Sequence, residues 1–354
     1  MKRIFILLAV MLMTVGLFAE EAVLIDFTRL GADIIPDTRE IEGQEQQMTQ
    51  NRATIMDFGA VAGGSFTDDQ RRLMKTSLAI RNWTVRLNSS ARTTTREVLS
   101  YAEEAQSRQY GTVMGVRVNF PTEPWNAHAF IRPPFEIPAF EAEAEIDDEG
   151  NINRTGSGIT GFSRFEGPLE DGQERPAFAY GVVKNVGTIR SVAVNVYGLN
   201  FPHGLSAILI DNDGNERIVF MGYLNFDGWA ELIWNNPAYI EQVRNRELRL
   251  IPLYPTATPF VKFGGFLISR DADKQGGDFI TYFRDAKIIF DKAVLDTDRD
   301  IDDVGLWNII QTRETARQLF EMSRFGQMQI LRYLEQQKQA TTNTFTPSPR
   351  VDEN

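Results

Sequence analysis

Residues 205–234, LSAILIDNDGNERIVFMGYLNFDGWAELIW, contain three apolar runs separated by two Asp-Gly pairs. Asp-Gly between apolar runs favours a tight hairpin turn, because glycine tolerates the positive φ that such a turn requires. Asp213-Gly214 lies between the first two runs, and Asp227-Gly228 lies between the second and the third. The stretch therefore predicts a three-stranded antiparallel meander.

The segment DNDGN, residues 211–215, could instead begin a calcium-binding loop. Such a loop needs oxygen ligands at positions 1, 3 and 5, glycine at position 6 and a bidentate glutamate at position 12. Counted from Asp211, position 6 is Glu216 and position 12 is Gly222, while the glycine falls at position 4. The acidic segment 296–303, DTDRDIDD, fails at the same two positions. We predict a metal-free hairpin at the first segment and a solvated lead into a helix at the second.

Alternation of apolar and polar residues continues on both sides of this stretch, from residue 22 to about 294. It is clear in NWTVRLN (82–88), VMGVRVNF (113–120) and SVAVNVYGL (191–199). This period is typical of half-buried antiparallel strands. Many such strands separated by Gly, Pro, Asn and Asp predict a mainly β protein, an antiparallel β-sandwich of jelly-roll-like form. A division near residue 145 into two β lobes is the alternative.

Helical patterns are confined to two segments. TTTREVLSYAEEAQSRQ, residues 93–109, predicts a minor helix, and residues 303–338 predict a longer C-terminal α-helix. The sequence thus divides into four predicted parts: a signal peptide (1–19), a β-sandwich domain (20–302) with an acidic excursion (141–158), the C-terminal helix (303–338) and a disordered tail (339–354).

The first nineteen residues have the pattern of a secretory signal. Lys2 and Arg3 precede the apolar run IFILLAVMLMTVGL, and Ala19 provides a small residue for cleavage. This pattern predicts export from the cytoplasm. Because no second long apolar run follows, we expect no membrane association after the signal is cleaved.

Composition excludes several classes of function. The formal net charge of −11 disfavours nucleic acid as a partner, because acidic surfaces repel phosphate backbones. The chain has no cysteine, which excludes disulfides, thiolate metal sites and thiol catalysis. His128 and His203 are the only histidines and form no recognisable metal or catalytic motif. These observations predict no bound metal and no cofactor, whereas a pair of catalytic carboxylates would leave no recognisable motif.

Three segments carry a resemblance to a known family: LIDF (24–27), NFPTEPWNAHAFIRPPFEIPAF (119–140) and the block from VVKNVG to NNPAYI (182–240). They resemble the FlaA-type outer-layer, or sheath, proteins of the spirochaete periplasmic flagellar filament. The resemblance implies a non-catalytic structural subunit that coats a flagellin core in the periplasm and contributes to filament stiffness and motility. Its implied partners are flagellin core subunits and other copies of itself or sheath paralogues.

Two other functions stay open at this point. The first is a secreted carbohydrate-binding β-sandwich for peptidoglycan or another glycan, which a cleft lined by solvent-facing Trp125 or Trp229 would favour. The second is a glycoside-active enzyme, which two carboxylates about 5–10 Å apart in a deep groove would favour. Both rest on fold analogy.

The C-terminal helix is the predicted assembly element. Projected at 100° per residue, one apolar stripe combines Leu306, Ile309, Ile310, Ala316, Phe320, Met328, Leu331 and Leu334. We expect part of this stripe to pack on the sandwich. A second apolar group consists of Trp307, Met322, Phe325 and Tyr333. It has no partner within the chain when the first stripe packs on the sandwich, so residues 305–338 are predicted to bridge to an adjacent subunit or to the flagellin core. The predicted assembly surface consists of Trp307, Arg313, Arg317, Met322, Arg324, Phe325 and Tyr333.

Overall fold

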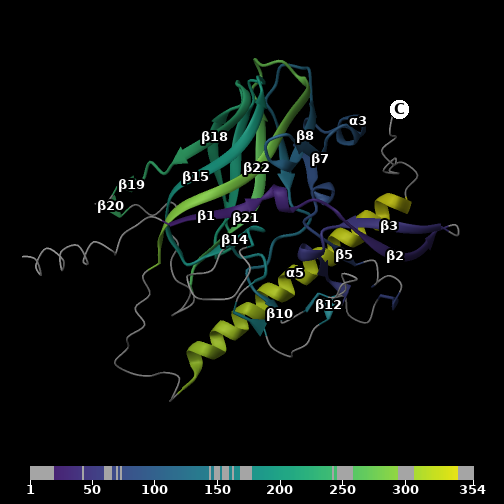
Figure 1. Cartoon of the computed structure of the whole chain (residues 1–354), viewed down its shortest axis with the longest axis vertical. Coiled ribbons are helices and arrows are strands. Elements are labelled where there is room, and N and C mark those ends of the chain that lie inside the picture. The colour runs from purple at the N-terminus through teal and green to yellow at the C-terminus, as the bar shows by residue number, and fades with distance from the viewer. Residues whose placement is uncertain are drawn as a thin grey trace, which may run out of the picture.

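The computed structural model describes residues 20–41, 44–59, 66–68, 71, 74–142, 145–146, 152–153, 159–161, 163–167, 178–240, 243–244, 258–293 and 307–341. Two antiparallel sheets pack face to face, and one long helix, α5 (Ile309–Thr341), lies beside them (Figure 1). This arrangement confirms the predicted β-sandwich with a C-terminal helix.

The first sheet has the strand order β18-β15-β22-β8-β7, with β1 paired to β22. Its strands are β1 (Glu20–Asp26), β7 (Tyr101–Ser107), β8 (Gly111–Phe120), β15 (Val186–Leu199), β18 (Asp227–Asn235) and β22 (Gly277–Lys292). The second sheet has the order β17-β16-β21-β9-β6, with β14 paired to β21. Its strands are β6 (Thr84–Leu87), β9 (Ala127–Arg132), β14 (Val182–Lys184), β16 (Gly204–Ile210), β17 (Glu216–Tyr223) and β21 (Phe260–Arg270). Both sheets combine strands from before and after residue 145, so the chain does not divide there into two lobes.

Smaller elements surround the sandwich. Short two-stranded ladders are formed by β2 (Asp33–Ile41) with β3 (Gln44–Gln50), β4 (Met56–Asp57) with β5 (Lys75–Thr76), β10 (Glu141–Ala142) with β13 (Ile159–Thr160), β11 (Glu145–Ile146) with β12 (Ile152–Asn153), and β19 (Tyr239–Ile240) with β20 (Val243–Arg244). The short helices are η1 (Phe27–Arg29), η2 (Arg52–Thr54), η4 (Ile80–Asn82) and α3 (Thr94–Val98).

The core lies between the two sheets and is rich in phenylalanine. Phe266 of β21 stacks on Phe283 of β22, with ring centroids 4.2 Å apart, so this pair joins the two layers. Phe27 contributes edge contacts to Trp83 and Phe263 at 5.3 and 6.3 Å. Such ring pairs add to the large area that each aromatic side chain buries.

The predicted meander is only half correct. β16 and β17 form the expected hairpin around Gly214, whose φ is +82°. β18, however, pairs with β15 in the other sheet, so the connection after β17 crosses between the layers. Leu224 in this connection is buried in the core, and its backbone N–H donates to the carbonyl of His203. An apolar residue inside the linker thus anchors a crossover where the sequence predicted a second hairpin.

The minor helix predicted over residues 93–109 is also shorter than expected. The Thr93 side chain accepts a hydrogen bond from Arg96 N–H and caps α3, which ends at Val98. Tyr101–Ser107 instead forms strand β7 on the edge of the first sheet, paired with β8. Pairing with β8 and burial of Ala102 override the helix propensity of the sequence EEAQ.

Several other predicted segments fall outside the described part of the chain. The signal segment 1–19 and residues 342–354 lie outside the described residues, as do most of the excursion 141–158 and the acidic segment 296–303. Helix α5 continues to Thr341, three residues beyond the predicted end at 338. None of the helices in the described part of the chain combines the length and apolar composition needed to cross a membrane.

Candidate interaction surface

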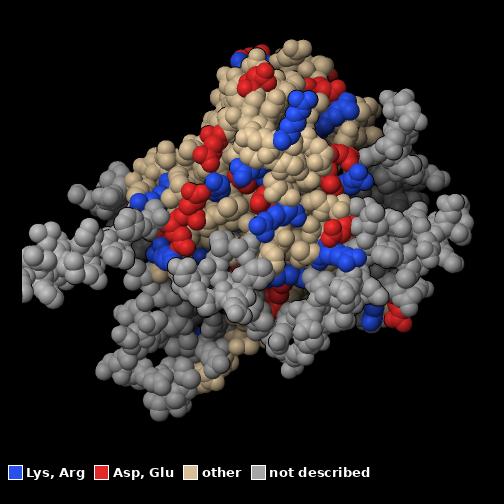
Figure 2. Space-filling view, in the orientation of Figure 1, with Lys and Arg blue, Asp and Glu red and all other residues tan. Residues whose placement is uncertain are grey.

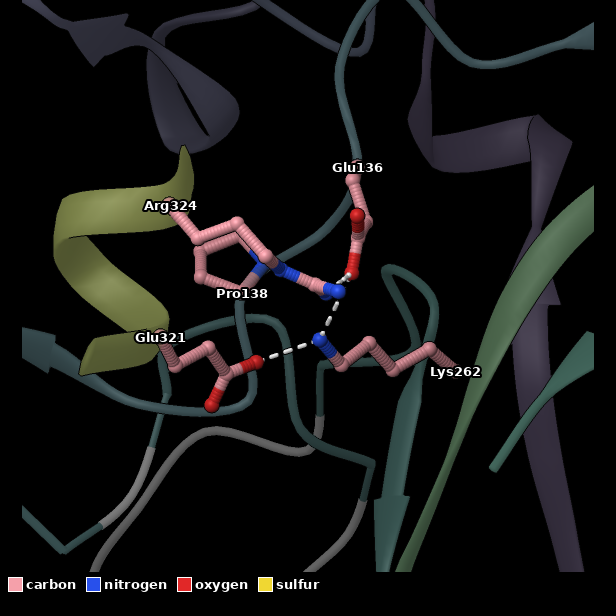
Figure 3. A pocket seen from close by; sticks show the side chains of 5 residues that line it. All are labelled: Glu136, Pro138, Lys262, Glu321 and Arg324. Atoms are coloured by element: carbon pink, nitrogen blue, oxygen red, sulfur yellow. Dashed lines mark hydrogen bonds and ion pairs between the residues drawn. The ribbon is translucent and has the colours of Figure 1, made fainter. Parts of the chain in front are cut away.

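Helix α5 is attached to the second sheet by ion pairs. Lys262 of β21 lies between two carboxylates, Glu321 of α5 and Glu136 of the loop after β9, and its side chain is only 3% exposed. The Lys262 ammonium is 3.2 Å from the Glu136 carboxylate and also contacts the Glu321 carboxylate. Arg324 of α5 donates to Glu136 as well (Figure 3). Two cations therefore face two anions where the helix crosses the sheet.

Further polar contacts between α5 and the sandwich lie along the helix. Arg317 donates to the backbone carbonyl of Asn212 at 2.8 Å and pairs with Asp213 at 3.5 Å, both in the β16–β17 turn. The backbone N–H of Ala139 donates to Glu321 at 3.2 Å. Among the described side chains of α5, Ile330 adds an apolar contact beside the Phe58 and Met74 pair.

The contact between α5 and the second sheet is closely packed and is not a ligand pocket. Glu136, Pro138, Lys262, Glu321 and Arg324 line a crevice that leaves no space for a water molecule. In Figure 3 the charged ends of these side chains converge on one point between helix and sheet. The arrangement can hold the helix in place, and it has no room for a substrate.

The most buried described side chains of α5 are polar, and several of its apolar side chains are exposed. Gln318 and Gln329 are buried, with 7% and 3% exposure. The large exposed apolar side chains of α5 are Ile309 (45%), Leu319 (53%), Phe320 (70%), Leu331 (62%) and Leu334 (36%), and Trp307 just before the helix is 71% exposed. We call Ile309, Phe320, Leu331 and Leu334 the outward stripe; at 100° per residue they fall within one narrow arc.

This orientation turns the outward stripe, which is the exposed part of the predicted first apolar stripe, away from the sandwich, while Met328 of the same stripe is half-buried. Lys262 is buried on the second sheet, and a buried ammonium must be paired with carboxylates. Glu321 satisfies it only when the polar side of α5 faces the sheet. The outward stripe is consequently turned toward solvent.

The described residues of the predicted assembly surface differ in exposure and in contacts. Trp307 and Arg313 are exposed, and Met322 is half-buried. Arg317 and Arg324 contact Asp213 and Glu136 of their own chain. The side chains of Phe325 and Tyr333 lie outside the described ones. The outward stripe was visible in the sequence, but which side of the helix faces the sheet was not.

A second exposed apolar surface lies on the outer face of the second sheet and was missed by the sequence analysis. Ile218, Phe220 and Tyr223 of the edge strand β17 are 52%, 47% and 45% exposed. Leu267 of β21 and Phe130 of β9 follow Phe220 across the same row of the sheet, and both are half-buried. We call these five residues the β17 patch. The apolar run after Asp213-Gly214 predicted this strand, and the structure shows that both faces of β17 carry apolar side chains.

The outer face of the first sheet is different. Figure 2 shows acidic and basic side chains interspersed on the side of the molecule that carries β1, β15 and β22. Ion pairs on this sheet include Arg117 with Asp278 and Lys287 with Glu21. Charges of both signs alternate there, so this face lacks the apolar character of the β17 patch.

The turn between β16 and β17 uses its acidic groups internally. The Asp211 carboxylate accepts hydrogen bonds from the backbone N–H groups of Asp213 and Asn215, at 3.0 and 2.9 Å. Such side-chain-to-backbone bonds are typical of Asx turns. Within the described residues no group of three or more metal-ligating side chains could hold an ion.

Both histidines belong to the sandwich. His203 is 3% exposed, and its ring contacts Phe279 and Phe120 at 4.6 and 5.0 Å. Burial, with a smaller contribution from the positive charge of Arg270, lowers the pKa of His203 to about 4. Burial also lowers the pKa of His128, on β9. Neither histidine adjoins a catalytic arrangement in the described part of the chain.

Comparison with known proteins identifies the family. The family model for the flagellar filament outer layer protein FlaA matches residues 47–299. A flagellar filament outer layer protein of Treponema pallidum is 49% identical over 98% of this chain and 97% of its own length. The chain belongs to this family. Related outer layer proteins of Spirochaeta aurantia and Borreliella burgdorferi are 39% and 31% identical, covering 98% and 68% of this chain and 95% and 64% of their own lengths.

Membership of the flagellar filament outer layer family confirms the predicted resemblance and the predicted non-catalytic, structural role. Solved structures with a similar arrangement of strands include TmCBM61 in complex with β-1,4-galactotriose, with 10% identity, and a family 11 carbohydrate-binding module of a Clostridium thermocellum cellulase, with 7% identity. They cover 60% and 62% of this chain and 90% and 91% of theirs, with TM-scores of 0.25 and 0.27. Scores this low do not bear on function.

Proposed function

We propose that this flagellar outer layer protein is a subunit of a sheath that coats the flagellin core of a periplasmic flagellum and stiffens the filament. The signal pattern at residues 1–19 would carry the chain across the inner membrane to the periplasm. Its partners would be flagellin core subunits and other copies of itself or sheath paralogues. The family membership supports the filament as the place where the chain works.

The single observation that carries an assembly role for α5 is its inverted orientation. The helix contacts its own sandwich through ion pairs and leaves Phe320 and Leu331 exposed to 70% and 62%. Fully burying such side chains stabilises a contact by about 1.5–3 kcal/mol each, before ordering costs. An exposed stripe of this size is typical of a surface that is covered in an assembly.

Residues near the start of α5 belong to the same proposal. Trp307 and Arg313 are exposed beside the first turn of the helix, where Asn308 accepts hydrogen bonds from Thr312. Met322, Phe325 and Tyr333 remain candidate contact residues from the sequence pattern. The outward stripe joins them as the better exposed part of the helix.

Electron microscopy of isolated filaments tests the proposed function. Filaments from cells that lack this chain should be thinner and more flexible than filaments from parent cells, and re-expression should restore both properties. Filaments of unchanged diameter in the deletion strain would contradict a coating role.

The geometry does not favour the carbohydrate-binding alternative. The Trp229 ring is packed edge-on by Tyr110 and Tyr197, at 5.0 and 5.3 Å, which leaves it half-buried. Trp125 is 42% exposed in the loop after β8, without a second aromatic ring paired to it among the described contacts. A stacking platform for a sugar ring needs an open aromatic face, which Trp229 does not offer.

A further inference from the structure

The chain carries two exposed apolar surfaces of different shape. One is the outward stripe of α5, a helical ridge. The other is the β17 patch, an apolar part of a sheet face. The two surfaces are complementary in type, because a helix commonly packs on the face of a sheet.

The second sheet already shows how a helix covers this face. Ile210 and Lys262 are paired across β16 and β21, and Lys262 contacts Glu321 of the chain's own α5. In the next row Ile208, which is fully buried, is paired with Ile218 of β17, which is 52% exposed. The outer face is therefore buried at Lys262, Ile208 and Ile210 and open at its apolar edge strand β17.

Helix α5 is long enough to serve two sandwiches. Its 33 residues span about 50 Å at 1.5 Å per residue. The ion pairs and the Ile330 contact that fix it to its own chain lie between Arg317 and Ile330. Ile309 lies before this segment and Leu334 after it, and Figure 1 shows the first turns of the helix lying away from both sheets.

We propose that neighbouring copies of this chain join head to tail, with the outward stripe of α5 on one copy covering the β17 patch of the next. This inference rests on the proposed function, in which many copies stand side by side in one layer. A symmetric dimer that pairs stripe with stripe, or patch with patch, would leave the other surface exposed. A two-fold dimer that exchanges helices would cover both surfaces but would be closed, so it could not extend into a layer. A head-to-tail contact covers both surfaces with one interface and, when repeated, produces an open line of copies.

Charge supports an apolar contact between copies. The formal net charge of −11 makes two copies repel each other at long range, so adhesion must come from short-range contacts. The β17 patch offers Phe220 and Tyr223, whose rings contact each other at 5.4 Å and form a continuous apolar surface. Phe320 and Leu331 are the matching side chains on the helix.

The chain has no cysteine, so engineered cysteines report this contact directly. Two variants each carry Ile218→Cys together with one helix change, either Phe320→Cys or Leu331→Cys. A matched control combines Phe320→Cys with Val98→Cys, since Val98 is 56% exposed on α3. Each mature chain is treated with a short thiol cross-linker, both as concentrated purified protein and in isolated filaments.

We expect a ladder of cross-linked oligomers from at least one Ile218→Cys variant and monomers from the Val98→Cys control and from each single variant. Dimers from Phe320→Cys alone would show stripe-to-stripe pairing and overturn the proposal. The absence of a ladder in both Ile218→Cys variants, in protein and in filaments, would overturn it as well. The amount of chain recovered with filaments is measured separately, so a failed coating role is distinguished from a failed contact.

Discussion

Lys262 of β21 and Glu321 of α5 form a buried ion pair that fixes which side of the C-terminal helix faces the sandwich. The Lys262 side chain is 3% exposed and the Glu321 side chain 13%. Because the pair occupies the polar side of α5, the apolar outward stripe faces solvent. A single electrostatic requirement inside the chain thus determines what the molecule presents to its neighbours.

Removing one partner of this pair should destabilise the chain. Glu321→Ala leaves the buried ammonium with Glu136 alone, so we expect the free energy of unfolding to fall by about 2–4 kcal/mol. Urea unfolding followed by circular dichroism measures this change. As a control, Arg81→Gln removes an exposed partner of Glu103, with 53% and 33% exposed side chains, and should cost less than about 1 kcal/mol. Equal losses in the two variants would contradict a special role for the buried pair.

His203 should make the fold sensitive to mild acid. Its pKa is about 4 in the folded chain and about 6.5 in the unfolded chain, so only the unfolded state gains a proton between these values. Stability therefore falls as the pH drops from about 6.5 to about 4, and this one group accounts for about 3 kcal/mol of the loss. His203→Phe should remove that contribution.

The measurement compares urea unfolding of the parent chain and His203→Phe at pH 7 and at pH 4.5. Carboxylates titrate alike in both, so the difference between the two pH slopes isolates His203. At pH 7 the variant should be at least as stable as the parent, because both ring nitrogens of His203 are buried without a hydrogen-bond partner in the described structure. Identical slopes for the two chains would show that His203 is not buried in its neutral form.

Gly265 should tolerate no side chain. It has a φ of +120°, and a Cβ atom there would lie 2.1 Å from the carbonyl oxygen of Ile131 on the neighbouring strand. Gly265→Ala should therefore lower the free energy of unfolding by at least about 3 kcal/mol. Gly111, with a φ of +74° and open space around it, is the matched control. Gly111→Ala should cost only about 1 kcal/mol, and a comparable loss at both positions would refute the steric explanation.

Local patterns in the sequence predicted the strands and one of the turns. Asp213-Gly214 predicted the β16–β17 hairpin because the turn needs only a residue that tolerates positive φ. Asp227-Gly228 has the same residues, and Gly228 also has a positive φ of +101°. Yet β18 pairs with β15, because burial of Leu224 takes the connection across to the other sheet. Turn chemistry is local, whereas the choice of sheet depends on residues far apart in the sequence.

The orientation of α5 could not be predicted for the same reason. An amphipathic pattern shows that one side of a helix is apolar, and the usual inference is that this side packs on the core. Here the deciding residues are Lys262, which lies 59 positions before its partner Glu321, and Glu136, which lies 188 positions before its partner Arg324. Long-range pairing of this kind leaves no periodic signal, so the sequence located the helix and its stripe but not the side that is exposed.

Removal of α5 should separate folding from assembly. A chain that ends at Val304 keeps every strand of both sheets and loses the described apolar contact of Ile330 with Phe58 and Met74. We expect this truncated chain to retain its β-sheet circular dichroism signal and its cooperative unfolding, at lower stability because Lys262 loses Glu321. It should no longer coat filaments. A chain that ends at Thr341 keeps the whole helix and is the control, which should coat filaments normally.

The exposed stripe itself is tested in the full chain by changing Phe320 and Leu331 together to serine. Both side chains are exposed, so the free energy of unfolding should change by less than about 0.5 kcal/mol. Binding to filaments should nevertheless fall at least about tenfold, which corresponds to about 1.4 kcal/mol and is less than the burial of one such side chain yields. Sedimentation of the variant with filaments that lack the native chain gives the bound fraction. Normal binding by this stably folded variant would exclude the outward stripe from the assembly contact, whatever the truncated chain does.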